Sequence, residues 1–295
     1  MTLKKQKLRS QKNDPNKPAY QIIPKYVLPS HTVDDLNLFE IYNQDKSSSC
    51  VAYATKFLAE YYIYNKNKLA TKLATNPPTN PATNPVKTNI SVYSLYYEAR
   101  QNDTSTTNDE IDVGTSVYAG LYVLSNGYRL ETELLSDKKN WGHNIAKPPP
   151  GYDLLEINRL NLKYRTNVFS VKRIISDVKY YLYFNLPIIF SLKLHNSDKR
   201  FESLGSDVYK PKSFSSGYYG QHCLIIVGYD DSKNAFLCRN SYGKNYGVDY
   251  NGNGYDYSND YLNDNRGYFY MDYTFLTFKD NKINDFVMDD MYIII

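Results

Sequence analysis

The hydrophobic period changes along this sequence, and that change limits the folds that the chain can adopt. In the first part, apolar side chains recur at helical spacing, and the predicted helices cover about 50–65, 90–101, 115–126 and 170–184. The later part has short apolar runs bounded by turn residues, and the predicted strands cover 188–194, 222–229, 235–240 and 267–273. Helices followed by strands predict an α+β protein of two lobes.

The chain of 295 residues is long enough to bury a large core within one domain. We expect that domain to cover 31–290, with a helical lobe at about 31–165 and a strand-rich lobe at about 166–290. Two polar stretches are expected to be surface insertions. In the first, at about 66–89, Asn-Pro recurs at a period of four residues, and each proline blocks helix. The second insertion is expected at about 248–265.

Two stretches far apart in the sequence carry residues suited to nucleophilic catalysis. Cys50 stands at the predicted start of a helix, where unpaired N–H groups and the helix dipole stabilise a thiolate. His222 begins one predicted strand and Asn240 ends the next, so an antiparallel pair would bring them together. A histidine can then take the thiol proton, while the asparagine orients its ring. Gln44 precedes the helix and could donate a hydrogen bond to an oxyanion.

In these stretches the chain resembles the papain-like cysteine peptidases, in particular a compact microbial or viral-type branch without a long pro-segment. The matching stretches, which together span about 30–290, are Gln44 with 47–53, 91–100, 112–116, 221–229, 240–243 and 267–270. The resemblance implies a cleft between a helical lobe and a barrel-like antiparallel β lobe. It implies the triad Cys50, His222 and Asn240, with Gln44 as oxyanion donor and no cofactor.

The same resemblance implies residues that bind a polypeptide substrate. The backbone of Gly114, Thr115 and Ser116 would hold the substrate in an extended form. Cys223 would line the pocket for the second residue before the scissile bond. Tyr242 stands where the family has the tryptophan that shields the His–Asn pair.

Other departures from the family pattern lie beside the expected nucleophile. Ser48 replaces a glycine and Val51 replaces a tryptophan, so local repacking is expected. Ser47 stands where secreted members carry a disulfide cysteine. None of these changes removes a group that the chemistry needs.

The expected function is therefore a cysteine endopeptidase. Two alternatives use the same fold. In one, the triad acts on isopeptide bonds, as in the removal of ubiquitin-like tails, or performs acyl transfer. In the other, more remote, alternative the protein is a non-enzymatic binder.

Residues 1–30 are expected to form an extended arm, with seven basic residues and one acidic residue in its first 25 positions. A solvated tail is the simplest interpretation. An alternative is that the arm lies across the cleft and inhibits the enzyme. The net charge of +4 does not predict nucleic-acid binding, although the arm could contact an acidic surface weakly.

The composition favours an intracellular protein in a reducing compartment such as the cytoplasm. Its three cysteines do not suggest a disulfide framework, and neither a secretory signal nor a membrane span of roughly 18 apolar residues is expected. The many Tyr, Asn, Lys and Ile residues suggest an AT-rich genome, as in a large DNA virus, where packaging in the virion is conceivable, or a protist. A monomer is expected.

Residues 249–260 contain Asp-x-Asn-x-Asn-Gly, the first half of a calcium loop. The candidate oxygen ligands are Asp249, Asn251, Asn253, the Tyr255 carbonyl and Asp260. The last ligand is Asp where Glu is usual, and no flanking helices are predicted. A plain surface loop is the expected structure, and no metal site is predicted.

Overall fold

We describe a computed structural model of the chain. The structure describes residues 28–74, 88–104, 111–132, 166–195, 207–214, 219–251 and 266–295, with Ser136, Lys147, Pro148, Tyr152, Phe201, Leu204 and Gly205 between them. The side chains of 71–74, His195 and Tyr219 are not among the described features. The arm up to residue 27, residues 75–87 and residues 252–265 lie outside this part of the chain, so the predictions for them stay predictions.

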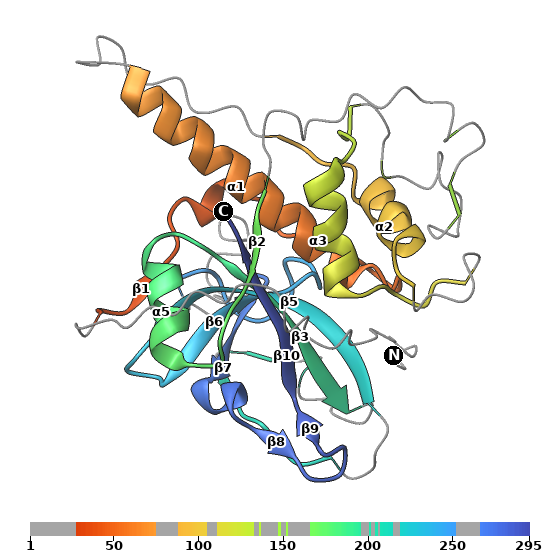
Figure 1. Ribbon diagram of the computed structural model, residues 1–295. Helices are drawn as coiled ribbons and strands as arrows, with labels where there is room; N and C mark the ends of the chain where they lie inside the picture. Colours follow the sequence, from red (N-terminus) through yellow and green to blue (C-terminus); the bar gives the residue numbers. More distant parts are fainter. Residues whose placement is uncertain are drawn as a thin grey trace.

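A helical layer stands against one large sheet (Figure 1). The layer consists of α1 (Cys50–Ala74), α2 (Val92–Gln101) and α3 (Val117–Asn126), while α5 (Ile175–Tyr183) packs near the start of the described chain. The helices α2 and α3 pack on α1, which in turn packs on strand β5 (Tyr219–Asp230). This arrangement confirms the predicted α+β class.

The sheet has the order β2-β10-β3-β5-β6-β7-β4, and β1 pairs with β5 off this path. The remaining strands are β1 (His31–Thr32), β2 (Val168–Ser170), β3 (Ile188–His195), β4 (Val208–Tyr209), β6 (Ala235–Arg239), β7 (Tyr268–Asp272) and β10 (Met288–Ile294). All neighbours are antiparallel except β4 and β7. A separate ribbon joins β8 (Lys279–Asp280) to β9 (Asp285–Phe286), and the short helices are η1 (Leu36–Leu38) and η5 (Tyr273–Leu276).

The four strands predicted from short apolar runs are confirmed as β3, β5, β6 and β7. The hydrophobic period of the sequence did not predict two features of the fold, the full length of α1 and the strand β10. The helix α1 runs to Ala74 rather than to about residue 65, because 66–74 are mostly good helix formers and the first proline after the start of the helix is Pro77. The strand β10 lies in the sheet, although Asp289 and Asp290 interrupt its apolar run.

The start of the described chain crosses to the sheet. His31 and Thr32 pair with Tyr229 and Gly228 of β5, although this segment was assigned to the helical lobe from the sequence. The chain then runs along the border between helices and sheet until α1 begins. The segment before α1 thus pairs with the sheet side at two places, through β1 and through the isolated bridge between Asn43 and Tyr242.

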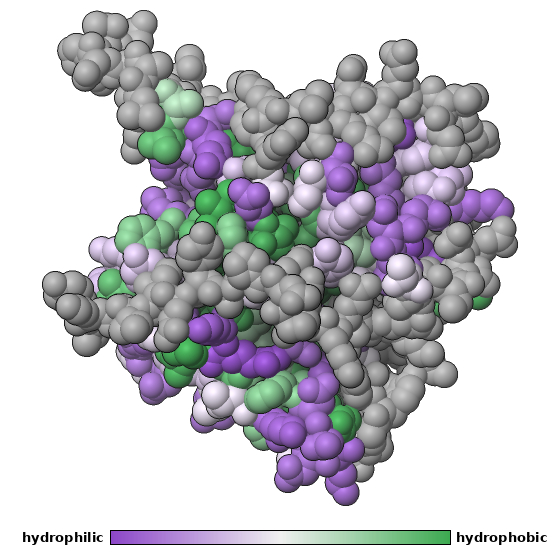
Figure 2. Space-filling view, viewed as in Figure 1, coloured by the Kyte–Doolittle hydropathy of each residue, from purple (hydrophilic) through white to green (hydrophobic). Residues whose placement is uncertain are grey.

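One apolar region of the surface lies where α1 approaches the last strand (Figure 2). Leu69, Phe184 and Ile295 are exposed there and line a groove between α1, the turn before β3 and the end of β10. Within the described residues, no helix has both the length and the apolar character needed to cross a bilayer.

Candidate active site

Cys50 is the first residue of α1, as the sequence predicts, and its side chain is buried. The helix begins with the carbonyl of Ser49, which accepts a hydrogen bond from the N–H of Tyr53 at 3.1 Å. The preceding loop is closed by the carbonyl of Gln44, which accepts from the N–H of Ser47 at 3.1 Å and from its hydroxyl at 2.6 Å. The nucleophile candidate thus sits on a tight turn at a helix N-terminus.

The sheet brings His222 and Asn240 together. The strands β5 and β6 pair antiparallel, and beyond the pair Ile225–Arg239 the imidazole Nε2 of His222 lies 2.7 Å from Oδ1 of Asn240. The same Oδ1 accepts a hydrogen bond from the N–H of Ser241 at 2.8 Å, which fixes the orientation of the amide. An amide oxygen can only accept, so Nε2 of His222 carries the hydrogen.

This tautomer leaves Nδ1 of His222 with a free lone pair. The nitrogen is buried and has no hydrogen-bond partner among the described residues. On the other side, the sulfur of Cys50 interacts with the backbone N–H of Cys223, the residue next to His222. The thiol therefore contacts the backbone of the residue that follows His222, and among the described residues it forms no direct hydrogen bond with Nδ1.

Aromatic rings enclose the imidazole. Tyr242 stacks on His222 with ring centroids 4.8 Å apart and an interplanar angle of 29°. Phe201 meets the imidazole edge-on at 5.8 Å, and Tyr246 meets Tyr242 in the same way at 5.4 Å. The ring of Tyr242 therefore covers one face of the imidazole.

Gln44 is buried between the two lobes. Its backbone N–H donates to the carbonyl of Ser241 at 2.9 Å, and its Oε1 accepts from the hydroxyl of Ser241 at 2.6 Å. Its Nε2 donates one hydrogen to the carbonyl of Ser47 at 2.8 Å. An amide nitrogen has two hydrogens, so one remains for a ligand.

The closed site keeps both reactive groups uncharged. Burial raises the pKa of Cys50 to about 12, although backbone N–H groups, including that of Cys223, partly offset this effect. Burial also lowers the pKa of His222 to about 4, although the hydrogen bond that His222 donates to Asn240 partly offsets this effect. Near neutral pH this geometry therefore holds a thiol and a neutral imidazole.

The predicted substrate-binding turn lies at the start of α3. Gly114 has φ 84°, a backbone conformation that favours glycine, and its N–H donates to the hydroxyl of Tyr96 at 3.1 Å. The carboxylate of Asp103 accepts from the N–H of Ser116 at 2.7 Å and from the hydroxyl of Thr115 at 3.1 Å. The hydroxyl of Ser116 accepts from the N–H of Ala119 and caps the helix.

Sequence reasoning did not find the two carboxylates that organise this region. Asp103 holds Thr115 and Ser116, while Asp112 accepts hydrogen bonds from the N–H of Ser48. Neither residue belongs to a periodic pattern, and each works through a contact with a distant part of the chain. The only sequence signal is their position on either side of the polar stretch 103–112.

Cys223 is buried beside Cys50, and burial raises its pKa well above the ordinary value. It is the cross-strand partner of Ser191 on β3, whose hydroxyl donates to Oδ2 of Asp290 at 3.1 Å. Asp290 is a further buried acid close to the site, and sequence reasoning missed it. Burial raises the pKa of Asp290 to about 7, and the nearby charge of Asp289 adds to the shift.

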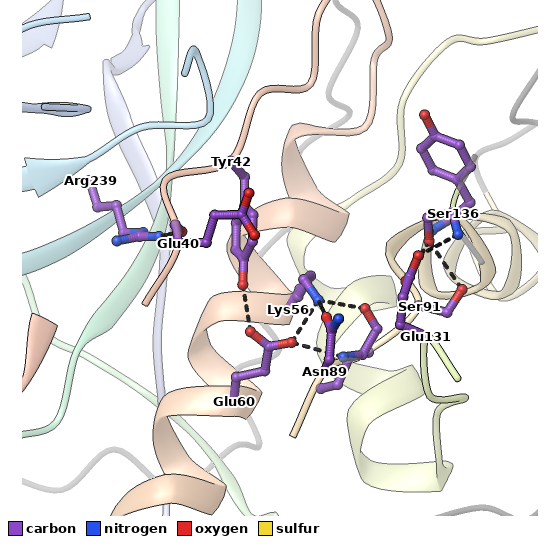
Figure 3. A network of polar contacts seen from close by, with 11 residues as sticks. Glu40, Tyr42, Lys56, Glu60, Asn89, Ser91, Glu131, Ser136 and Arg239 are labelled. Carbon is purple, nitrogen blue, oxygen red and sulfur yellow. Dashed lines mark hydrogen bonds and ion pairs between the residues drawn. The ribbon is translucent and has the colours of Figure 1, made fainter. Parts of the chain in front are cut away.

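A buried network of charged groups lies on the helical side of the segment that joins β1 to α1 (Figure 3). The ammonium group of Lys56 contacts a carboxylate oxygen of Glu60 at 2.6 Å, and the other oxygen of Glu60 accepts from the hydroxyl of Tyr42 at 2.5 Å. Arg239, next to Asn240, donates to the carbonyl of Glu40 and lies 4.3 Å from the ring centroid of Phe57. The network fastens the segment before Gln44 to α1 and to the end of β6.

The described residues contain no group of three or more His, Cys, Asp or Glu side chains that could hold a metal ion. Of the candidate calcium loop, Asp249 and Asn251 are described, and the carboxylate of Asp249 accepts from the N–H of Asn251 at 2.9 Å. That contact is an ordinary side-chain turn. The remaining candidate ligands, Asn253, Tyr255 and Asp260, lie outside the described part of the chain.

Comparison with known proteins identifies the family of the chain. The model of the Peptidase_C39 like family matches residues 37–268. The comparison with curated proteins found no match.

The fold is similar to that of several cysteine proteases. Xylellain, a cysteine protease from Xylella fastidiosa, matches with a TM-score of 0.66 and 20% identity over 100% of this chain and 97% of that chain. The procathepsin B S9 from Trypanosoma congolense matches with a TM-score of 0.60 and 12% identity over 97% and 85% of the two chains. The Carica candamarcensis cysteine protease CMS1MS2, solved in complex with E-64, gives 0.53 and 11% over 90% and 97%.

At these identities the structural matches establish the fold, while the family model establishes the relationship in sequence. The resemblance to papain-like peptidases inferred from the motifs is thereby confirmed. The chain belongs to the Peptidase_C39 like family and is a thiol protease with the papain-like fold.

Proposed function

We propose that the protein is an endopeptidase in which Cys50 is the nucleophile, His222 is the general base and Asn240 orients the imidazole. The observation that carries the proposal is the tautomer of His222. Its Nε2–H is committed to Asn240 at 2.7 Å, which leaves the basic Nδ1 without a partner among the described residues, while the Cys50 sulfur contacts the backbone N–H of the next residue, Cys223. That is the arrangement that a thiol–imidazole pair needs.

The reaction then proceeds in two stages. Nδ1 of His222 takes the thiol proton, and the Cys50 sulfur forms a bond to the carbonyl carbon of a peptide. His222 returns the proton to the leaving amine as the C–N bond breaks, which leaves an acyl–Cys50 thioester. Water, deprotonated by His222, attacks the thioester, and the thiolate leaves and recovers the proton.

The oxyanion of each tetrahedral intermediate needs hydrogen-bond donors. Gln44 supports this role because one hydrogen of its Nε2 is not used by Ser47, and the backbone N–H of Cys50 at the helix start is the second donor. One such donor is typically worth about 3 kcal/mol of transition-state stabilisation. The hydrogen bonds from Gln44 to Ser241 and Ser47 hold the amide in place before the substrate arrives.

The substrate is a polypeptide, and we propose that it lies extended along Gly114, Thr115 and Ser116. The N–H groups of Gly114 and Ser116 are already paired within the protein, so this turn offers carbonyl groups to a substrate strand. Cys223, which adjoins Cys50, would line the pocket for the second residue before the scissile bond, and Tyr242, which stacks on His222, would shield the His222–Asn240 pair.

The closed geometry has a consequence for activation. Because Cys50 and His222 are buried and uncharged, proton transfer between them is unfavourable until substrate or solvent enters the site. Whether residues 1–30 regulate this entry is tested by removing residues 1–25. An increase in peptide hydrolysis supports an inhibitory arm, and an unchanged rate contradicts it.

The cellular setting that we propose is a reducing one. Cys50, Cys223 and Cys238 are all free thiols, and all three are buried. A thiol nucleophile persists longest where the surroundings keep it reduced. Loss of activity on mild oxidation, with recovery on adding a thiol reductant, is the expected behaviour.

The deciding experiment is intact-mass analysis after exposure to E-64, followed by peptide mapping. We expect one adduct on Cys50, which disappears in His222→Ala. Cys238→Ala is the matched control, because this buried thiol on β6 lies away from the proposed triad, and its labelling should equal that of the wild type. Labelling of another cysteine, or of none with and without residues 1–25, would contradict the assignment. Parallel assays on linear and isopeptide-linked substrates separate an endopeptidase from an isopeptidase.

A further inference from the structure

The loop that carries the nucleophile and the turn proposed to bind substrate meet at one carboxylate. Asp112 accepts hydrogen bonds from the N–H of Ser48 through both oxygens, at 2.9 and 3.1 Å. The hydroxyl of Ser48 donates to the backbone carbonyl of Asp112 at 3.2 Å. Asp112 thus holds the chain two residues before Cys50 with three contacts.

The same carboxylate reaches the other loop through a buried tyrosine. The hydroxyl of Tyr96 donates to Oδ1 of Asp112 at 2.6 Å and accepts from the N–H of Gly114 at 3.1 Å. Tyr96 is fully buried, and burial together with the Asp112 charge raises its pKa, so the hydroxyl stays protonated and remains a donor. The result is a continuous chain of donors and acceptors from Gly114 through Tyr96 and Asp112 to Ser48.

The surroundings keep this chain of contacts in place. Arg100, also buried, donates to the carbonyl of Ile111 at 2.5 Å and fixes the backbone before Asp112. All three cysteines are free thiols, so no disulfide performs this cross-linking. Successive hydrogen bonds in a low-dielectric setting polarise and strengthen one another, which suits them to hold two loops in one register.

We propose that Asp112 and Tyr96 are positioning residues that lock the substrate-binding turn at Gly114 to the nucleophile loop at Ser48–Cys50. This inference rests on the proposed function, because it assigns the register between the turn that holds the peptide and the sulfur that attacks it. A peptide bound at Gly114 is thereby presented to Cys50 at a fixed distance. Small losses of such alignment can lower turnover by about 10²-fold.

Electrostatics alone would act in the opposite direction. The main cause of the raised pKa of Cys50 is burial, and the negative charge of Asp112 adds to it. If Asp112 acted only through its charge, Asp112→Asn would make the thiol easier to ionise and faster to alkylate. If Asp112 acts through position, the same variant loses peptide turnover whatever happens to the thiol.

The test uses the full-length chain and the variants Tyr96→Phe, Asp112→Asn and their combination. Each is assayed for kcat and KM on a peptide and for the rate of Cys50 alkylation by iodoacetamide, which does not need the substrate turn. We expect about a tenfold or larger fall in kcat/KM for each single variant. The double variant should lose little more than the worse single one, because both break the same chain of contacts.

Two matched variants separate positioning from general destabilisation. Asp103→Asn loosens Thr115 and Ser116 without touching the nucleophile loop, so its effect should add to that of Asp112→Asn. Ser48→Ala removes only the hydroxyl contact and leaves the N–H bond to Asp112, so its effect should be the smallest. Melting temperatures identify any variant that fails to fold, and the remaining single variant then decides.

Three outcomes would overturn the inference. Multiplicative losses in the Tyr96→Phe and Asp112→Asn pair would mean that the residues act separately. Alkylation that falls in parallel with peptide turnover in Tyr96→Phe would indicate a generally disrupted site. An unchanged kcat/KM in Asp112→Asn would mean that the contact is incidental. Failure of the triad itself is distinguishable, since Cys50→Ala would then retain activity in the same assay.

Discussion

The two halves of the candidate active site are held in place by different means. On the sheet side, His222 and Asn240 are placed by backbone ladders, because β5 pairs with β3 over eight residues and with β6 on its other edge. On the helical side, the loop before Cys50 is held by the carboxylate of Asp112, and the turn at 114–116 is held by the carboxylate of Asp103 and the hydroxyl of Tyr96. Regular pairing tolerates the loss of one contact, whereas a loop held by one side chain does not.

The largest expected effect is on the helical side, at the nucleophile. Cys50→Ala should abolish peptide hydrolysis, because no other group can form the acyl intermediate. The protein should stay folded, since the change removes one sulfur atom from a buried position. Hydrolysis of a fluorogenic peptide and thermal melting measure the two effects. Measurable turnover in pure Cys50→Ala would place the nucleophile elsewhere.

The next effect tests the sheet side. His222→Ala should lower kcat/KM by about 10²–10⁴-fold, the usual contribution of a general base. It should also change the pH dependence of Cys50 alkylation. In the wild type the neutral imidazole can take the thiol proton as the sulfur reacts, so alkylation does not depend on the thiolate alone. Without the imidazole only the thiolate reacts, and because burial raises the pKa of the thiol, the rate should rise only in the alkaline range. Identical alkylation profiles for wild type and variant would show that His222 does not receive the proton.

Asn240→Ala should have a smaller effect than His222→Ala. The base remains, but Nε2 loses the acceptor at 2.7 Å that fixes the tautomer. We expect a fall of about tenfold or more in kcat, with little change in KM. Stacking by Tyr242 should still orient the ring in part, so Asn240→Ala combined with Tyr242→Leu should lose more than either change alone. If Asn240→Ala matches His222→Ala in severity, the ring depends on Asn240 entirely.

The smallest expected effect is on the free energy of unfolding. It sharpens the comparison, because the regular sheet holds a buried carboxyl group, that of Asp290. The pKa of Asp290 is raised from 3.8 to about 7, so the folded state binds more protons than the unfolded state between these values. Stability is then lost as pH rises from about 4 to about 7. Asp290→Asn should remove this loss and stabilise the protein at pH 8 by at most about 4 kcal/mol. Asparagine also suits the φ of 51° at this position.

Denaturant melts of wild type and Asp290→Asn at pH 4 and pH 8 provide the measurement. The two proteins should be alike at pH 4 and differ at pH 8. His222 behaves in the opposite way, because its pKa is lowered to about 4. The stability that its neutral form contributes is lost as pH falls from about 6.5. A gain in Asp290→Asn that is equal at both pH values would mean that packing, and not charge, is responsible.

The same contrast explains what the sequence could predict. The strands β3, β5, β6 and β7 are short apolar runs between turn residues, and the pairing of β5 with β6 follows from the turn that joins them. Once β5 and β6 are paired, the meeting of His222 and Asn240 follows as well. Cys50 at a helix start followed from the helical spacing of the apolar residues that begin there. These predictions depended on local patterns, which a sequence displays directly.

The remaining features depend on contacts between distant residues. β1 contains only two residues, and the backbone of β10 is irregular at Asp290, so neither shows a clear period. Asp112 and Tyr96 matter because the fold brings them beside Ser48 and Gly114. The residue types alone suggested that Cys50 and His222 form an ion pair. In the structure, burial keeps both groups neutral.

The backbone pairing around Gln44 has a mechanical consequence. The N–H of Gln44 bonds to the carbonyl of Ser241 at 2.9 Å, and the N–H of Gly243 bonds to the carbonyl of Tyr42 at 2.9 Å. These two hydrogen bonds join the lobes at one seam, which begins one residue after Asn240. A rotation that separates the lobes while these bonds remain formed has its axis at this seam. In such a rotation Gln44, the proposed oxyanion donor, lies at the seam and would move least.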